Sequence, residues 1–75
     1  MAIDRNPQLT VPVTTSAHYT ECEPWCNINI GNWNEAWWRD FPDIARSVAL
    51  GQGPQPETYW FTNERDAIMF RLRFA

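Results

Sequence analysis

The sequence predicts an α+β domain, in which helices cover one face of a small antiparallel sheet as in the ferredoxin-like (split βαβ) fold or a truncated variant of it. Three observations predict this class. The chain has 75 residues, which suits a single domain. Several short stretches alternate apolar and polar residues or concentrate aromatic ones, as strands do. Helix caps and stops separate these stretches.

The first strand is expected after a flexible arm that covers residues 1–8. Leu9, Val11 and Val13 recur at every second position, which is strand periodicity. Because proline has no N–H to donate, Pro12 indicates that this strand lies at an edge of the sheet.

A helix is predicted between this strand and Gly31, since glycine often follows a helix C-terminus. Ser16 is a candidate N-cap. Pro24 suits only the first turn of a helix, because later turns need its missing N–H. We therefore expect the regular helix to start near Cys22 or Glu23, with the preceding residues as an entering turn.

Two further strands are expected in the middle of the chain. In residues 32–42, NWNEAWWRDFP, the asparagines suit a turn and the aromatic residues favour a half-buried strand. Residues 43–56 are expected to form an insertion, with a short helix in DIARSVAL and a loop in GQGPQP. Residues 57–62, ETYWFT, carry aromatic side chains on both faces and are predicted to form a central strand.

The last helix is expected to begin at Asn63, because Asn63 and Asp66 resemble a capping box. It is predicted to run to about Phe70. Residues 70–74, FRLRF, then alternate apolar side chains with arginines, as a strand does. Two alternatives stay open for these residues: a frayed continuation of the helix or a short strand.

The composition argues against several kinds of function. The net charge is −3 and all six basic residues are arginine, so the chain has few cations for counterion release and nucleic acid is not expected as a partner. No apolar run approaches the roughly 20 residues that span a bilayer, and the first ten residues lack a signal-peptide core. We therefore expect a cytoplasmic protein with reduced cysteines and no membrane partner.

One constellation suggests metal chemistry. His18, Cys22 and Cys26 are spaced by four residues and would share one face of an unbroken helix, as zinc ligands do. Pro24 interrupts that geometry and no fourth ligand follows, so both cysteines are interpreted as small buried apolar residues. The chain also lacks a nucleophile elbow and a phosphate-binding loop. We expect no metal, no cofactor and no enzymatic activity.

The aromatic residues point instead to a contact surface. Five tryptophans, four phenylalanines and two tyrosines exceed the need of so small a core, because each buries roughly 150–250 Å². In a strand, Trp37 and Trp38 would point to opposite faces, and an exposed tryptophan beside Arg39 is typical of an interface hot spot. The alternative is that both tryptophans are buried. The expected partner-binding residues are Trp37, Trp38, Arg39, Phe41 and Arg46.

A second candidate site uses the C-terminal arginines. If residues 70–74 form a strand, Arg71 and Arg73 project from one face and can bind a phosphate or an acidic group. The alternative is a solvated face with Glu57 or Glu64 as neighbours.

The segments PWCNINIG and YWFTNERDAIMFRLRF together resemble small uncharacterised proteins of tailed phages, which carry W-C-x-x-x-I-G in the middle and F-x-x-x-x-D-A-x-x-F-x-L-x-F/W at the end. Residues 43–56 have no counterpart in this pattern. The matching residues are Trp25, Cys26, Ile30, Gly31, Phe61, Asp66, Ala67, Phe70, Leu72 and Phe74. The resemblance implies a phage origin.

The expected function is therefore that of a phage-type accessory protein that binds a bacterial host protein and inhibits or adapts it, as in anti-defence or host takeover. A homo-oligomer is left open. One alternative is an oligomeric sponge that captures nucleotides with tryptophan stacking and with Arg71 and Arg73. Others are a minor virion component and, last, a single-strand nucleic-acid binder.

Overall fold

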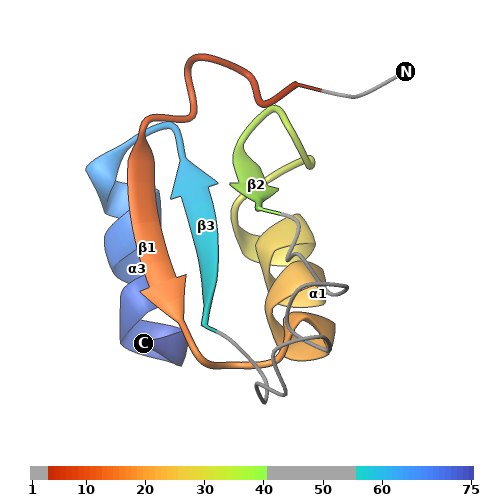
Figure 1. The fold of residues 1–75 in the computed structure, drawn as a ribbon, viewed down its shortest axis with the longest axis vertical. Coiled ribbons are helices and arrows are strands. Elements are labelled where there is room, and N and C mark those ends of the chain that lie inside the picture. The colour runs from red at the N-terminus through yellow and green to blue at the C-terminus, as the bar shows by residue number, and fades with distance from the viewer. Residues whose placement is uncertain (1–3, 41–55) are drawn as a thin grey trace, which may run out of the picture.

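A computed structural model describes residues 4–40 and 56–75 and shows an α+β domain. The predicted insertion at 43–56 lies outside the described residues except for its final proline. The elements, drawn in Figure 1, are β1 (Val11–Thr15), α1 (Tyr19–Asn29), β2 (Trp37–Arg39), β3 (Glu57–Phe61) and α3 (Glu64–Phe74).

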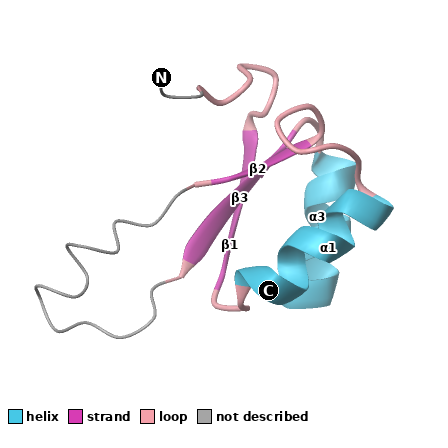
Figure 2. Cartoon of the chain, turned by 90° about the vertical axis from the view of Figure 1, so that its right-hand side faces the viewer, coloured by secondary structure: helices cyan, strands magenta, loops and turns pink. Residues whose placement is uncertain are grey.

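The three strands form one antiparallel sheet in the order β1-β3-β2. The central position predicted for the ETYWFT strand is confirmed, and Pro12 lies on an edge strand as expected. Both helices lie on the same side of the sheet, as Figure 2 shows. The predicted fold class is confirmed, and the small sheet is compatible with a truncated ferredoxin-like arrangement.

The core lies between the sheet and the two helices. Side chains on a strand alternate between faces, and Tyr59 and Phe61 of β3 both turn toward the helices. There the ring of Phe70 lies 4.7 Å from Tyr59 and 5.1 Å from Phe61, measured between centroids. The buried cluster is completed by Val13 of β1, Cys22 and Cys26 of α1, Trp37 of β2 and Ala67 of α3.

Helix α1 begins earlier than the sequence predicted. His18 is the N-cap, and its Nδ1 accepts from the Thr20 N–H at 3.3 Å. Pro24 therefore lies inside the helix, and neither the predicted start near Cys22 nor a cap at Ser16 is found. The missing N–H of Pro24 deprives only the carbonyl of Thr20, and this residue is exposed, so water can donate in its place.

The connection from α1 to β2 depends on two residues with positive φ. Gly31 has φ 151°, and a Cβ there would lie 2.8 Å from Cβ of Ala36, so a side chain at position 31 would collide. Asn34 has φ 62°, which asparagine tolerates better than most residues. The predicted glycine stop and asparagine turn are both present.

The start of α3 is as predicted, since Asn63 Oδ1 accepts from the Asp66 N–H at 2.9 Å. Its end resolves the open alternative, because the helix continues to Phe74 and no strand forms. Phe74 packs on Trp25, with ring centroids 5.5 Å apart, and its carbonyl accepts from Thr15 Oγ1 at 2.7 Å. These tertiary contacts favour the helix over the strand that the alternation suggested.

Residues 4–8, expected within a flexible arm, are attached to the turn before β2. The N–H of Asn6 donates to Asn34 Oδ1 at 2.8 Å, and Asn34 Nδ2 donates to the carbonyl of Asp4 at 3.2 Å. Leu9, which follows, is fully buried. The N-terminal segment thus reaches the sheet face that the helices leave open.

Candidate partner-binding surfaces

A group of tryptophans occupies the sheet face that points away from the helices. Trp38 of β2 and Trp60 of β3 are direct partners in the strand register. The ring of Trp33, from the preceding turn, stacks on Trp38 with centroids 4.8 Å apart and planes at 23°. The guanidinium of Arg5 lies 3.7 Å from the ring centroid of Trp60. We call Arg5, Trp33, Trp38, Asp40 and Trp60 the indole cluster.

Asp40 fixes this cluster through both of its carboxylate oxygens. Trp38 Nε1 donates to Oδ1 at 3.2 Å, and Trp60 Nε1 donates to Oδ2 at 3.0 Å. The backbone N–H of Asp40 donates to the carbonyl of Thr58 at 3.0 Å, so the carboxylate is itself anchored to β3. Two indole planes are thereby held in set orientations before any partner arrives.

The expectation that one tryptophan of the Trp37–Trp38 pair is exposed is wrong, since their exposed fractions are 1% and 5%. Trp37 lies beneath the helices and donates from Nε1 to the carbonyl of Gly31 at 3.0 Å. Trp38 points the other way, as strand alternation requires, but Trp33 covers it. Two other predicted partner-binding residues lie outside the described residues: Phe41 and Arg46.

Arg39 lies on the same side of the sheet as Trp37, as predicted, but it stacks on Tyr19, with Cζ 4.7 Å from the ring centroid. Its Nε lies 3.3 Å from Glu23 Oε2, and its Nη1 lies 3.1 Å from Glu57 Oε1. The side chain of Arg39 is only 13% exposed. Arg39 therefore joins β2 to α1 and β3 and offers little surface to a partner.

The expectation that Arg71 and Arg73 project from one strand face is wrong, because α3 continues through both. Residues two apart on a helix point to different sides. Arg73 lines a hollow of about 340 Å³ between α1 and α3, and Arg71 is exposed elsewhere on the helix. The paired phosphate contact expected of these arginines is not formed.

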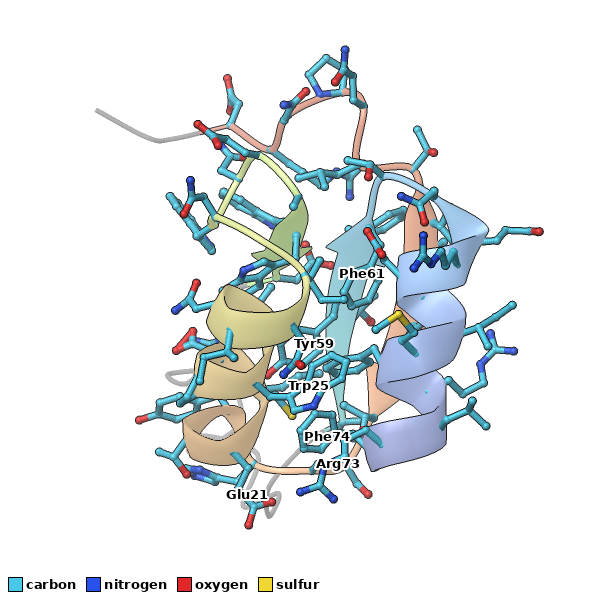
Figure 3. All side chains as sticks on the ribbon, turned by 180° about the vertical axis from the view of Figure 1, so that it is seen from behind. Glu21, Trp25, Tyr59, Phe61, Arg73 and Phe74 are labelled. Atoms are coloured by element: carbon cyan, nitrogen blue, oxygen red, sulfur yellow. The ribbon has the colours of Figure 1, made fainter. Side chains whose placement is uncertain are left out.

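The hollow combines an aromatic floor with one charge of each sign. Trp25 of α1 and Phe74 of α3 meet edge to face, and the carboxylate of Glu21 and the guanidinium of Arg73 stand at the same end of the helix pair (Figure 3). Across the described part of the chain, neither charge has a salt-bridge partner. We missed this site from sequence, although the four-residue spacing of Glu21 and Trp25 is a signal for it.

The cysteines belong to the core, as interpreted from the sequence. Cys22 and Cys26 are fully buried free thiols. Burial raises the pKa of Cys26 from its ordinary 9.0 to about 12, and burial likewise raises the pKa of Cys22. Within residues 4–40 and 56–75, no three His, Cys, Asp or Glu side chains are grouped as metal ligands. His18 is engaged in the helix cap.

Comparisons with models of protein families, with curated proteins and with solved structures find no match to this chain. The resemblance to tailed-phage proteins therefore stays a prediction that depends on the two motifs. In the part of the chain that the structure describes, no helix is long and apolar enough to cross a membrane.

Proposed function

We propose that this protein is a small non-enzymatic accessory protein of the phage type, which binds a bacterial host protein and inhibits or adapts it. The observation that carries the proposal is the indole cluster. Tryptophan and arginine are the residues most enriched among interface hot spots, and here three tryptophans and Arg5 gather on a sheet face that neither α1 nor α3 covers.

The cluster is prepared for binding rather than arranged only for stability. Trp33 and Trp60 remain half-buried, so each presents ring surface to a partner. Asp40 already holds two indoles, and a partner therefore does not have to immobilise them, which lowers the entropic cost of association. A partner that suits this surface brings an apolar side chain to Trp60 and a carboxylate to Arg5.

Residues outside the indole cluster argue against the rival functions. A nucleotide sponge was expected to use Arg71 and Arg73 together, and α3 separates them. In the described part of the chain, His18 caps α1 and burial keeps the two thiols protonated, so neither the histidine nor the cysteines are suited to act as a base or nucleophile. These observations favour binding to a protein.

The test is capture by the tagged protein from nuclease-treated bacterial lysate, read by mass spectrometry, followed by titration of the purified partner. We expect one protein to be enriched stoichiometrically. Trp60→Ala should weaken its binding by about 30-fold or more, as a hot-spot truncation does. Arg5→Glu should also weaken binding, because it reverses a charge at an exposed position without touching the core.

The matched control is Arg71→Glu, another exposed arginine away from the cluster, which should bind as the wild type does. Circular dichroism establishes that each variant is folded. If neither Trp60→Ala nor Arg5→Glu changes the affinity for the partner, the indole cluster is not the contact surface. The absence of any stoichiometric protein, with a nucleotide released on heating the purified sample, would favour the sponge.

A further inference from the structure

The two helices expose apolar side chains on the surface that faces away from the sheet. Ile28 of α1 is 82% exposed, and Leu72 and Ile68 of α3 are 84% and 50% exposed. Ile28 is two residues from the buried Cys26, and Leu72 is two residues from both Phe70 and Phe74, so both side chains point away from the core. We call the outer surface of α1 and α3 the helix layer.

The charges of the helix layer are divided between the two helices. Helix α1 contributes Glu21 to this surface and α3 contributes Arg73. Glu23 does not belong to it, because its carboxylate pairs with Arg39 of β2, and Arg71 lies on another side of α3. Glu21 and Arg73 stand at the same end of the layer, and no described residue forms a salt bridge with either. The helix layer therefore carries one acidic and one basic side chain next to each other, and each can form an ion pair.

We infer that the helix layer binds a second copy of this chain across a two-fold axis. A two-fold interface brings a surface onto itself, so the surface must be complementary to itself. The placement of the two charges meets this requirement, since Glu21 on α1 of one copy can face Arg73 on α3 of the other. An unrelated partner would need the same pattern, whereas a second copy supplies it.

The arrangement of the helices fixes where the axis lies. Helices α1 and α3 run side by side in opposite directions, with the start of α1 level with the end of α3 (Figures 1 and 3). An axis parallel to the helices and between them lays α1 of one copy over α3 of the other. Glu21 then meets Arg73 of the second copy, and Arg73 meets its Glu21, which gives two equivalent ion pairs.

The same axis brings apolar side chains together. At a rise of about 1.5 Å per residue, Ile28 lies roughly 10 Å beyond Glu21 along α1, and Ile68 lies roughly 8 Å beyond Arg73 along α3. Ile28 of one copy is thus level with Ile68 of the other, and the exposed Leu72 lies near the ion pairs. One end of the interface is charged, and the apolar side chains follow it along the helices.

The size of the layer sets the expected affinity. Each helix has 11 residues and is therefore about 16 Å long. Two such helices present less than the roughly 800 Å² per partner of a standard interface, so the dimer should be weak, with a dissociation constant in the micromolar range. The opposite sheet face, with the indole cluster, stays free in this dimer, so this inference does not depend on the proposed function.

The experiment is sedimentation velocity of the full chain over a concentration range from about 1 to 500 μM, which brackets a dimer of this size. We expect the wild type to pass from monomer to dimer. Glu21→Arg and Arg73→Glu each place like charges opposite each other twice and should each weaken the dimer by about tenfold or more. An equimolar mixture of the two variants should associate again, because every pair then joins an arginine to a glutamate.

Arg71→Glu is the matched control, since it changes the same last turn of α3 on another side and should leave the dimer intact. Leu72→Asp is a second disruptive variant, and its side chain is too exposed to unfold the monomer. A wild type that stays monomeric throughout, or a mixture of the two charge variants that fails to associate, would overturn the inference. So would unchanged self-association of Glu21→Arg, Arg73→Glu and Leu72→Asp.

Discussion

Asp40 is the residue on which the open sheet face depends. Its two oxygens accept from the indoles of Trp38 and Trp60, and its own N–H is bonded to β3. A buried donor that loses its acceptor destabilises a fold by about 1–3 kcal/mol. The Trp38 N–H is the more buried of the two, because its ring is covered by Trp33.

We predict that Asp40→Ala lowers the free energy of unfolding by about 1–2 kcal/mol, because the Trp38 N–H loses its carboxylate acceptor while that of Trp60 can reach water. Near-ultraviolet circular dichroism should change as the indoles lose their fixed orientation. Urea unfolding measures the first effect. Asp4→Ala is the control, since only the backbone carbonyl of Asp4 is bonded and its side chain is exposed.

The buried thiols predict a stability loss in alkaline solution. The pKa of Cys26 is raised to about 12 in the folded chain, so unfolding releases its proton once the pH exceeds its ordinary 9.0. A raised pKa stabilises the fold fully below pH 9 and loses this contribution as the pH rises toward 12. At pH 10.5 Cys26 alone should remove about 2 kcal/mol, at 1.36 kcal/mol per unit.

Urea unfolding at pH 8 and pH 10.5 tests this expectation. The buried Cys22 and Tyr59, whose pKa values burial also raises, act in the same direction. Cys26→Ala should show a smaller difference between the two pH values than the wild type does. Equal urea midpoints at both pH values would mean that the thiols ionise freely in the folded chain.

At the scale of elements, the C-terminal half of α3 provides the clearest test of helix against strand. In a strand, Phe70 and Leu72 would lie on the same face, and truncating either side chain would lower the stability by a similar amount. In the helix, Phe70 contacts Tyr59, Phe61 and Phe74, while Leu72 is exposed. The two positions should therefore respond differently to truncation.

We predict that Phe70→Ala lowers the free energy of unfolding by about 3–5 kcal/mol, the usual loss for a buried phenylalanine. For a chain of this size that is enough to unfold most molecules. Leu72→Ala should change it by less than about 0.5 kcal/mol. Thermal unfolding followed by circular dichroism compares the two, and similar losses would contradict the helical assignment.

The elements that were predictable from sequence are those with local signals. The Asn63 cap and the aromatic strand at 57–62 are decided by neighbouring residues, and both are found. The end of α3 was not decided locally, because Trp25 packs on Phe70 and Phe74 from another helix. The start of α1 was predicted too late because Pro24 was expected in the first turn. The helix tolerates Pro24 in its interior, since only one hydrogen bond is lost, at an exposed turn.

The candidate sites were less predictable than the elements. Strand alternation placed Trp38 on the outer face of the sheet, but it could not show that Trp33 would fold back over it. Nor could it show that Asp40 would reach Trp60, which follows 20 residues later. Tertiary contacts of this kind decide which aromatic residues remain accessible.

At the scale of the whole molecule, Arg39 ties three elements together. It joins β2 to Glu23 of α1 and to Glu57 of β3, and the side chain of Glu57 is only 14% exposed. Removal of a largely buried cation leaves the carboxylate of Glu57 without compensation, which is the costly change for an ion pair away from water.

We predict that Arg39→Ala destabilises the fold by about 2–4 kcal/mol. The double variant Arg39→Met/Glu57→Gln should be closer to the wild type, since no uncompensated charge remains next to β3. Urea is the denaturant to use, because guanidinium chloride is a salt and would screen the interactions of Arg39 with Glu23 and Glu57. Equal losses for the single and double variants would show that packing of the arginine side chain, rather than charge, is what matters.

The order of the strands in the sheet has a consequence for biosynthesis. Strand β3 lies between β1 and β2 but is translated after both, and the hydroxyls of Thr14 and Thr58, 3.0 Å apart, are separated by 44 residues. A nascent chain that has reached only β2 contains two strands that are not neighbours in the final sheet. Pairing must wait for β3, and long-range pairing of this kind is slow. Most of the domain is therefore synthesised before its sheet can form, and tryptophans that the native fold covers, such as Trp37 and Trp38, stay exposed until β3 pairs.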